Sequence, residues 1–306
     1  MIKVGILGAD SPVAGEIIRI LIKHPETDLV SLYAPRFVGH NVTTKHHGLI
    51  GEPQLNFSDK LNLDEVDLVF IAEESELSEK IIEQFGKVEN LKIISLDQDF
   101  LKNLEEVVPE VGLSEINRKA LVRGARISYL SSPFISPSLV ALSPLADFLL
   151  LNSDIDIEIF APEDMLETFD CEKEGSKLKE LLKLHQSSFN ADINLNLKSN
   201  PGSGRGMMSK IKMKSSVPEE ELIKIYEGIY DDHNFTFLSP GKVNTDEVEG
   251  TQKIVINLEK PSADLLTINV VSDARLRGGA GDAVHVMNLF FGLHEKTGLH
   301  FKPSRF

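Results

Sequence analysis

The chain has 306 residues, which is more than one hydrophobic core usually serves and predicts two domains. Its formal net charge of −15 excludes a general nucleic-acid binder and argues against docking on an anionic membrane, because both need a basic surface. Apolar runs stay shorter than the roughly 18 residues of a membrane-spanning helix, and residues 1–7 lead into a predicted strand instead of a signal peptide. A single cysteine excludes an intramolecular disulfide and a cysteine-based metal site. We therefore expect a cytoplasmic protein that binds neither nucleic acid nor membrane.

The first 150 residues alternate short apolar runs with amphipathic stretches, which is typical of a parallel sheet covered by helices. Strands are predicted at residues 2–7, 28–33, 67–72, 91–96 and 127–130. Helices are predicted at residues 13–23, 75–85, 114–122 and 138–149.

After residue 151 the pattern changes. Residues 161–185 are acidic and predicted to be helical, and further helices are expected at 217–230 and 281–293. Period-two alternation, typical of a mostly antiparallel sheet with one buried face, occurs at residues 193–198, 208–214, 251–258 and 265–271. The fold class that follows is α/β for the first half and α+β for the second.

A glycine-containing segment, residues 5–15, lies between the first predicted strand and helix, where backbone N–H groups can hold a pyrophosphate. Gly5 and Gly8 keep part of the dinucleotide fingerprint, whereas Ser11 and Ala14 replace later glycines, and Asp10 places a negative charge where a phosphate would approach. The segment is therefore either a nucleotide loop or a turn that binds nothing. In the first case the contacts come from Gly5, Gly8, Asp10, Ser11, Pro12 and Val13.

Arg36 follows the second predicted strand, at the place where NAD-preferring domains carry an acidic residue for the ribose hydroxyls. A guanidinium suits a 2′-phosphate, so NADP is favoured over NAD as the cofactor. The alternative is a solvated loop arginine.

Four stretches resemble the semialdehyde dehydrogenase family, and the N-acetyl-γ-glutamyl-phosphate reductase branch more than the aspartate-semialdehyde dehydrogenases. They are residues 4–25, residues 67–72, residues 108–111 with 116–118, and residues 271–299. The last stretch, VSDARLRGGAGDAVHVMNLFFGLHEKTGL, is the most specific because of its glycine-rich turn and Met-Asn-Leu helix.

The resemblance implies a Rossmann-type NAD(P)-binding domain at residues 1–134, completed by 280–306, and an α+β dimerisation domain at 135–279. It adds Gly278 and Gly279 to the expected cofactor contacts. It also implies a homodimer or homotetramer, whose interface would be supplied by the alternating Ile193, Leu195 and Leu197.

The chemistry implied by the resemblance is NADP-dependent interconversion of an acyl phosphate and an aldehyde through a thioester, which needs a cysteine and a histidine. The cysteine position falls on Ile135 or, without a gap, on Pro133, and the nearby serines have no base within the segment. Cys171 lies among carboxylates that disfavour a thiolate. The arginine and histidine positions of the second domain fall on Lys198 and Arg205, and a guanidinium cannot shuttle a proton at neutral pH.

We therefore predict no catalytic residue in the family's positions. Lys198, Arg205 and Arg277 are predicted to bind a phosphate or carboxylate, with surface counter-charges as the alternative. The clustered His40, His46 and His47 lack a further ligand at suitable spacing, so no metal is expected.

Three functions remain open. The leading one is a semialdehyde-dehydrogenase-like protein that binds NADP without the thioester mechanism and serves in binding, sensing or assembly with a protein partner. An active NADP-dependent oxidoreductase on a small aldehyde or acyl phosphate, using other residues, is the alternative. A structural interaction protein that binds no nucleotide is the third.

Overall fold

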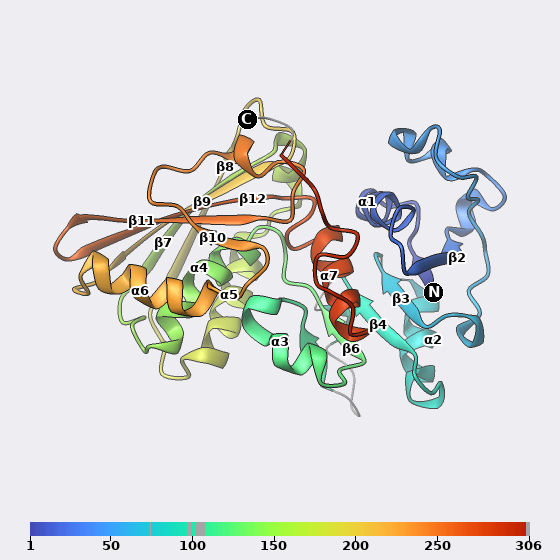
Figure 1. Ribbon diagram of the computed structural model, residues 1–306, viewed down its shortest axis with the longest axis horizontal. Helices are drawn as coiled ribbons and strands as arrows, with labels where there is room; N and C mark the ends of the chain where they lie inside the picture. Colours follow the sequence, from blue (N-terminus) through green and yellow to red (C-terminus); the bar gives the residue numbers. More distant parts are fainter. Residues whose placement is uncertain (74, 97–98, 102–107, 304–306) are drawn as a thin grey trace. The chain divides into compact units, whose positions relative to one another are not determined.

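The computed structural model describes residues 1–73, 75–96, 99–101 and 108–303, and it divides the chain into two compact units (Figure 1). Unit 1 comprises Met1–Ser131 and Gly278–His300, and unit 2 comprises Ser132–Arg277 and Phe301–Phe306. The domains expected from the sequence, with boundaries at 134 and 280, stay a prediction, and the last three residues of 280–306 lie outside the described residues.

Unit 1 contains a six-stranded parallel sheet in the order β2-β1-β3-β4-β6-β5, which confirms the α/β fold class. Its strands are β1 (Ile2–Leu7), β2 (Thr27–Tyr33), β3 (Leu68–Ile71), β4 (Lys92–Ser95), β5 (Glu110–Val111) and β6 (Ile127–Tyr129). Its helices are α1 (Pro12–Leu21), α2 (Glu76–Gln84), α3 (Ser114–Val122) and α7 (Ala280–Phe290). Every residue of β3 is buried, as expected for a parallel strand covered on both faces.

Helices α1 and α7 pack against each other in unit 1. His24, just after α1, and Asn288, near the end of α7, are joined by a hydrogen bond between His24 Nε2 and Asn288 Oδ1 of 3.0 Å. The C-terminal ends of the two helices therefore lie close together.

Unit 2 is built on a six-stranded mixed sheet in the order β10-β11-β12-β9-β7-β8. The three central pairings are antiparallel, as predicted, and the two outer pairings are parallel. The strands are β7 (Ile155–Ala161), β8 (Ile193–Ser199), β9 (Gly206–Lys214), β10 (Thr236–Leu238), β11 (Ile254–Ser262) and β12 (Leu265–Asp273). Helices α4 (Ser136–Asp147), α5 (Cys171–His185) and α6 (Glu219–Tyr230) pack on one face of this sheet (Figure 1).

The helix predicted at 161–185 is wrong at its start. Strand β7 ends at Ala161, a 3₁₀ helix spans Glu163–Thr168, and α5 begins only at Cys171. Asp170 caps α5, because its Oδ1 accepts a hydrogen bond of 3.0 Å from the Lys173 N–H. Because the whole stretch is acidic, the sequence pattern did not distinguish these separate elements.

The subunit interface predicted from Ile193, Leu195 and Leu197 is contradicted by the direction of their side chains. The three residues pair with the alternately buried positions of β7, such as Ile157. The Leu195 side chain lies 3.9 Å from the Cβ position of Gly175 on α5. These residues therefore face the helices, and the opposite face of the sheet, here called the open face, carries their polar neighbours.

The buried helix α4 contains Pro144, which has no N–H to donate to Val140 O. A tyrosine of α6 compensates, and a second one binds the next carbonyl. Tyr230 Oη donates to Val140 O and Tyr226 Oη donates to Ala141 O, both at 2.5 Å.

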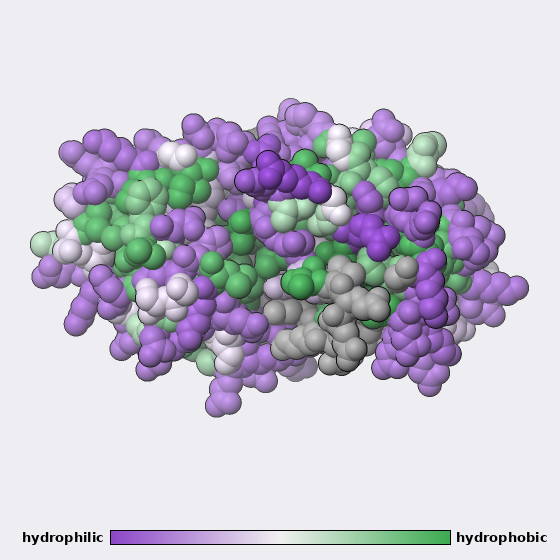
Figure 2. Space-filling view, turned by 90° about the horizontal axis from the view of Figure 1, so that it is seen from below, coloured by the Kyte–Doolittle hydropathy of each residue, from purple (hydrophilic) through white to green (hydrophobic). Residues whose placement is uncertain are grey.

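The surface shown in Figure 2 is mostly hydrophilic with small groups of hydrophobic residues, in keeping with the high net charge.

Candidate functional site

The loop between β1 and α1 depends on a glycine at one position. Gly8 has a φ of +73°, which side chains rarely adopt. A Cβ there would lie 2.6 Å from Glu73 Cβ and 2.9 Å from the Glu73 backbone nitrogen. The loop thus passes directly against the residues that follow β3, and only glycine fits.

The same loop ends in a well-formed helix N-terminus. Ser11 is the N-cap of α1, where its Oγ accepts a hydrogen bond of 3.4 Å from the Ala14 N–H, and Pro12 occupies the first helical position. This end of the helix carries partial positive charge and favours an anion. Gly5, by contrast, lies inside β1, where a Cβ would lie 2.5 Å from Leu61 Cδ1, so its role there is packing.

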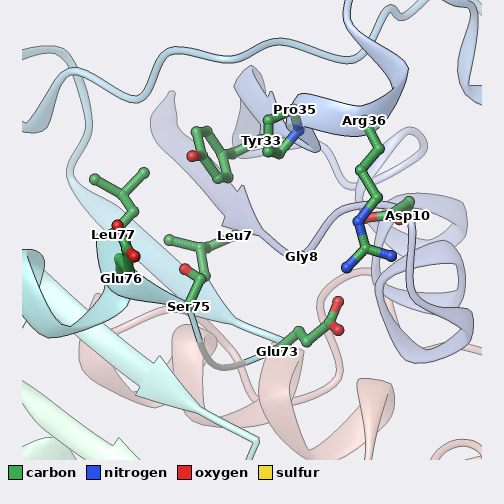
Figure 3. Close-up of a pocket in the computed structure, with 10 residues that line it drawn as sticks. All are labelled: Leu7, Gly8, Asp10, Tyr33, Pro35, Arg36, Glu73, Ser75, Glu76 and Leu77. Carbon is green, nitrogen blue, oxygen red and sulfur yellow. The ribbon is translucent and has the colours of Figure 1, made fainter.

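A cavity of about 270 Å³ opens at the ends of β1, β2 and β3, which is where parallel sheets commonly bind ligands (Figure 3). Among the predicted contacts it contains Gly8, Asp10 and Arg36, and the Arg36 side chain extends between Asp10 and Glu73. The full lining is Leu7, Gly8, Asp10, Tyr33, Pro35, Arg36, Glu73, Ser75, Glu76 and Leu77.

The cavity-lining residues that follow β3 were not predicted from the sequence. Glu73, Ser75 and Glu76 belong to no motif, and they reach the cavity because β3 is the neighbour of β1 in the sheet. Ser75 caps α2 through a capping box with Ser78. The prediction of a third strand followed by a helix was the available signal, since parallel strands end at one edge.

Gly278 and Gly279 precede α7 and do not line this cavity. Gly278 has a φ of +66°, and its N–H donates to Asp282 Oδ2 at 2.6 Å, while Gly279 is the N-cap. These glycines lie at the N-terminal end of α7, whose C-terminal end meets that of α1. Their contact with a cofactor stays a prediction.

The position where the resemblance places a nucleophilic cysteine is occupied by Ile135. It is the N-cap residue of α4 and is 1% exposed. Phe134 packs edge-on against Phe169 at 5.0 Å, and Ser132 Oγ accepts a hydrogen bond from the Phe134 N–H. Cys171 is exposed at the start of α5, where its thiol donates to Leu195 O at 3.2 Å.

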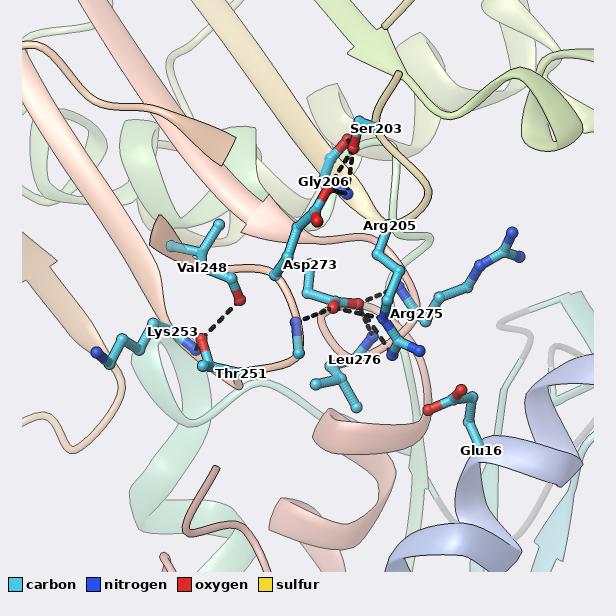
Figure 4. A network of polar contacts seen from close by, with 12 residues as sticks. Glu16, Ser203, Arg205, Gly206, Val248, Thr251, Lys253, Asp273, Arg275 and Leu276 are labelled. Atoms are coloured by element: carbon cyan, nitrogen blue, oxygen red, sulfur yellow. Dashed lines mark hydrogen bonds and ion pairs between the residues drawn. The ribbon is translucent and has the colours of Figure 1, made fainter. Parts of the chain in front are cut away.

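Arg205, at the expected histidine position, is held by a buried carboxylate (Figure 4). Asp273 is 0% exposed, and its Oδ2 accepts 2.8 Å and 2.7 Å hydrogen bonds from Arg205 Nε and the Gly250 N–H. Its Oδ1 accepts the N–H groups of Arg275 at 2.8 Å and Leu276 at 3.1 Å. Asp273 therefore ties together Arg205, the loop before β11 and the turn after β12.

The other two predicted anion-binding cations have different surroundings. Lys198 forms an ion pair with Glu158 on the open face, and this hydrogen bond lowers the pKa of Glu158. Arg277 is completely buried. A bound anion would have to displace a carboxylate from Lys198 or Arg205. The predicted anion pocket therefore stays a prediction, and the carboxylates already paired with these cations compete with an anion.

In the part of the chain that the structure describes, no group of three His, Cys, Asp or Glu side chains is arranged to hold a metal ion. None of the described helices combines the length and apolar character needed to cross a membrane.

Comparison with known proteins places the chain in a family. Residues 3–123 match the profile described as "Semialdehyde dehydrogenase, NAD binding domain". N-acetyl-gamma-glutamyl-phosphate reductases of Phocaeicola vulgatus and Bacteroides thetaiotaomicron are 33% and 32% identical over 326 residues, covering 100% of both chains.

Solved structures agree in fold. Aspartate semialdehyde dehydrogenase II of Vibrio cholerae, complexed with ASA, and the Candida albicans aspartate semialdehyde dehydrogenase with NADP both superpose with a TM-score of 0.71. Their sequence identities are 14% and 15%, and each match covers 95% of this chain and 98% of the other. From its full-length relatives and its matching NAD-binding domain, this chain belongs to the semialdehyde dehydrogenase family.

Proposed function

We propose that this chain is an NADP(H)-binding member of the family that does not carry out thioester chemistry and acts instead by binding, sensing or assembly. The observation that carries the proposal is Ile135, an aliphatic residue at the N-cap of α4 where the resemblance expects the cysteine. An isoleucine offers no lone pair to attack an acyl phosphate or an aldehyde.

The residues around the cavity fit the adenosine half of NADP. Its volume, about 270 Å³, is slightly below the roughly 300–1,000 Å³ of sites that enclose a whole drug-sized ligand, so it takes only part of a dinucleotide. Arg36 would bind the 2′-phosphate, and the Ser11–Pro12 end of α1 would face the pyrophosphate. When bound, NADP(H) supplies hydride transfer, and the carboxylates of Asp10 and Glu73 weaken its binding by repulsion.

The position of the acid/base also argues against the thioester mechanism. The guanidinium of an arginine stays protonated at physiological pH, and that of Arg205 is held by Asp273. With neither nucleophile nor proton shuttle in the family's positions, the anion pocket of Lys198, Arg205 and Arg277 would serve binding alone.

A homodimer through the open face is part of the proposal. On this face β7 presents Asp156 and Glu158, and the neighbouring β9 presents Lys210 and Lys212 opposite them in register. Adjacent acidic and basic rows are self-complementary, as a two-fold interface requires. A Lys210→Glu, Lys212→Glu variant should be monomeric by size exclusion with light scattering, and an unchanged mass would refute this interface.

The working oxidoreductase stays as a second candidate, favoured by the full-length identity to proteins named N-acetyl-gamma-glutamyl-phosphate reductase. Its nucleophile would have to lie outside the family's position, and the exposed Cys171 is the only cysteine to test, although the neighbouring carboxylates disfavour its thiolate. Loss of turnover in Cys171→Ala would identify that group.

One experiment separates the candidates. Thermal unfolding with NADPH at about 100 times its Kd should show a stabilisation of about 2.7 kcal/mol, a shift of a few degrees. Phosphate-dependent oxidation of small aldehydes is then measured on the same protein. Binding without turnover supports the proposal, turnover supports the second candidate, and no binding of NADPH or NADH leaves a structural interaction protein.

A further inference from the structure

His46 comes from the long connection between β2 and β3 and contacts the nucleotide loop of unit 1. Its backbone N–H donates to Val42 O at 2.9 Å, which ends a short 3₁₀ turn. Its Nε2 lies 2.7 Å from the carbonyl oxygen of Ala9, between Gly8 and Asp10. Because a carbonyl oxygen only accepts, His46 Nε2 carries the proton and donates it.

The imidazole of His46 also lies against the first turns of α1. A Cβ built at Gly15 would lie 2.5 Å from His46 Nδ1 and 2.9 Å from Cε1. The ring also packs edge-on against Phe57, with the ring centroids 6.0 Å apart. Gly15 is therefore required by a side chain from another segment, and the ring lies against both α1 and Phe57.

The hydrogen bond fixes the orientation of one peptide group in the loop. The Ala9 N–H is bound to Tyr33 O at 3.0 Å, and the Ala9 carbonyl is bound to His46. In a trans peptide the carbonyl of one residue and the N–H of the next point in opposite directions. The Asp10 N–H must therefore point away from His46, and Asp10 is the residue of this loop that lines the cavity together with Gly8.

We propose that His46 is a positioning residue of the dinucleotide site: by holding the Ala9 carbonyl it turns the Asp10 N–H toward the pyrophosphate of a bound nucleotide. A backbone donor at this point also offsets the repulsion between that pyrophosphate and the Asp10 carboxylate. The inference rests on the proposed NADP(H) binding and assigns a role to a residue outside the glycine loop and outside the cavity lining.

The test compares His46→Ala and His46→Gln with His47→Ala, the exposed neighbour, as the matched control. Affinity is measured by calorimetry for NADPH and for adenosine 2′-monophosphate, which shares the adenosine and 2′-phosphate but has no pyrophosphate. His46→Ala should weaken the binding of NADPH by about tenfold, as expected for roughly one hydrogen bond to a charged group. It should leave the affinity for adenosine 2′-monophosphate unchanged. His46→Gln, which keeps an N–H donor of similar reach, should recover part of the loss, and His47→Ala should bind both probes normally.

Equal weakening of both probes, or NADPH affinity within twofold of wild type, would overturn the role of His46 while leaving NADP(H) binding intact. If the wild-type protein binds neither probe, the proposed cofactor fails and this role fails with it. The geometry has its own test in thermal unfolding. Gly15→Ala should lower the Tm of the wild type, because the new methyl collides with the imidazole, but raise the Tm of His46→Ala, because alanine favours a helix over glycine. A lower Tm in both backgrounds would refute the contact.

Discussion

Replacing Asp273 by asparagine removes one charge from the centre of unit 2 while keeping the side chain's shape. The two carboxylate oxygens of Asp273 accept hydrogen bonds from five donors, with Arg205 Nε and the Gly250 N–H on Oδ2, and Arg205 Nη2 and the N–H groups of Arg275 and Leu276 on Oδ1. An asparagine must present an NH₂ group to one of these two sets. Either orientation leaves at least two donors facing a donor.

The size of the effect follows from this count. Each buried donor left without an acceptor costs about 1–3 kcal/mol, so two cost about 2–6 kcal/mol. The lost ion pair adds less than a fully buried pair would, because the Arg205 side chain remains 29% exposed and water can solvate it. We expect a destabilisation of about 3 kcal/mol, which lowers the Tm of a unit of this size by about 6–12 °C.

Differential scanning calorimetry measures this shift directly, and urea unfolding gives the corresponding free energy. Asp264→Asn is the control, because Asp264 is exposed in the turn between β11 and β12 of the same sheet and its replacement should change stability by less than about 0.5 kcal/mol. If Asp273→Asn lowers the Tm no more than Asp264→Asn does, the view of Asp273 as the residue that joins these segments is wrong.

Three further results are expected. Ile135→Cys should show no reductase turnover in an NADPH oxidation assay, because Arg205 still cannot move a proton, and measurable turnover would contradict the proposed function. Arg36→Ala should weaken NADPH by about tenfold and NADH by less than twofold, since only NADPH carries the 2′-phosphate; equal losses would place Arg36 away from that group. Burial lowers the pKa of His24 below its ordinary value of 6.5, so as the pH falls below 6.5 the unfolded chain takes up a proton that the folded chain resists, and stability falls. Urea unfolding between pH 7 and pH 5 should show a smaller decline for His24→Gln than for wild type, and parallel declines would rule out this origin.

The sequence was most informative where local pattern and final environment agree. Strand β3 is a continuous apolar run buried on both faces, and the turn after β1 carries its own glycine signal. Strand β7 was not predicted, although its apolar and acidic residues alternate regularly; the helix predicted at 161–185 overlaps it only at Ala161. The three-residue strand β10 is too short to have a period.

The site was predictable only where its residues are neighbours in sequence. Gly8 and Asp10 belong to one loop, whereas Glu73 enters the same cavity through the order of strands in the sheet. His46 was considered only as a metal ligand, and its hydrogen bond to Ala9 spans 37 residues that follow no repeating pattern. The pairing of Arg205 with Asp273 spans 68 residues and exists because β9 and β12 are adjacent antiparallel strands.

Ile135 and Arg205 stand where the resemblance implies a cysteine and a histidine, and the two differ in how readily those residues could be restored. Ile135→Cys removes a few buried methyl and methylene groups at one helix cap, a change that costs about 1–2 kcal/mol and disturbs no hydrogen bond of the side chain. Arg205→His would instead take a donor from Asp273, whose other partners hold the loop at Gly250 and the turn at Leu276. A histidine that reached Asp273 would donate one N–H where Arg205 donates from both Nε and Nη2, and it would leave the buried carboxylate with less compensation. Arg205 thus takes part, through Asp273, in holding segments of unit 2 together. This is the physical reason to expect a function that does not depend on proton transfer at that position.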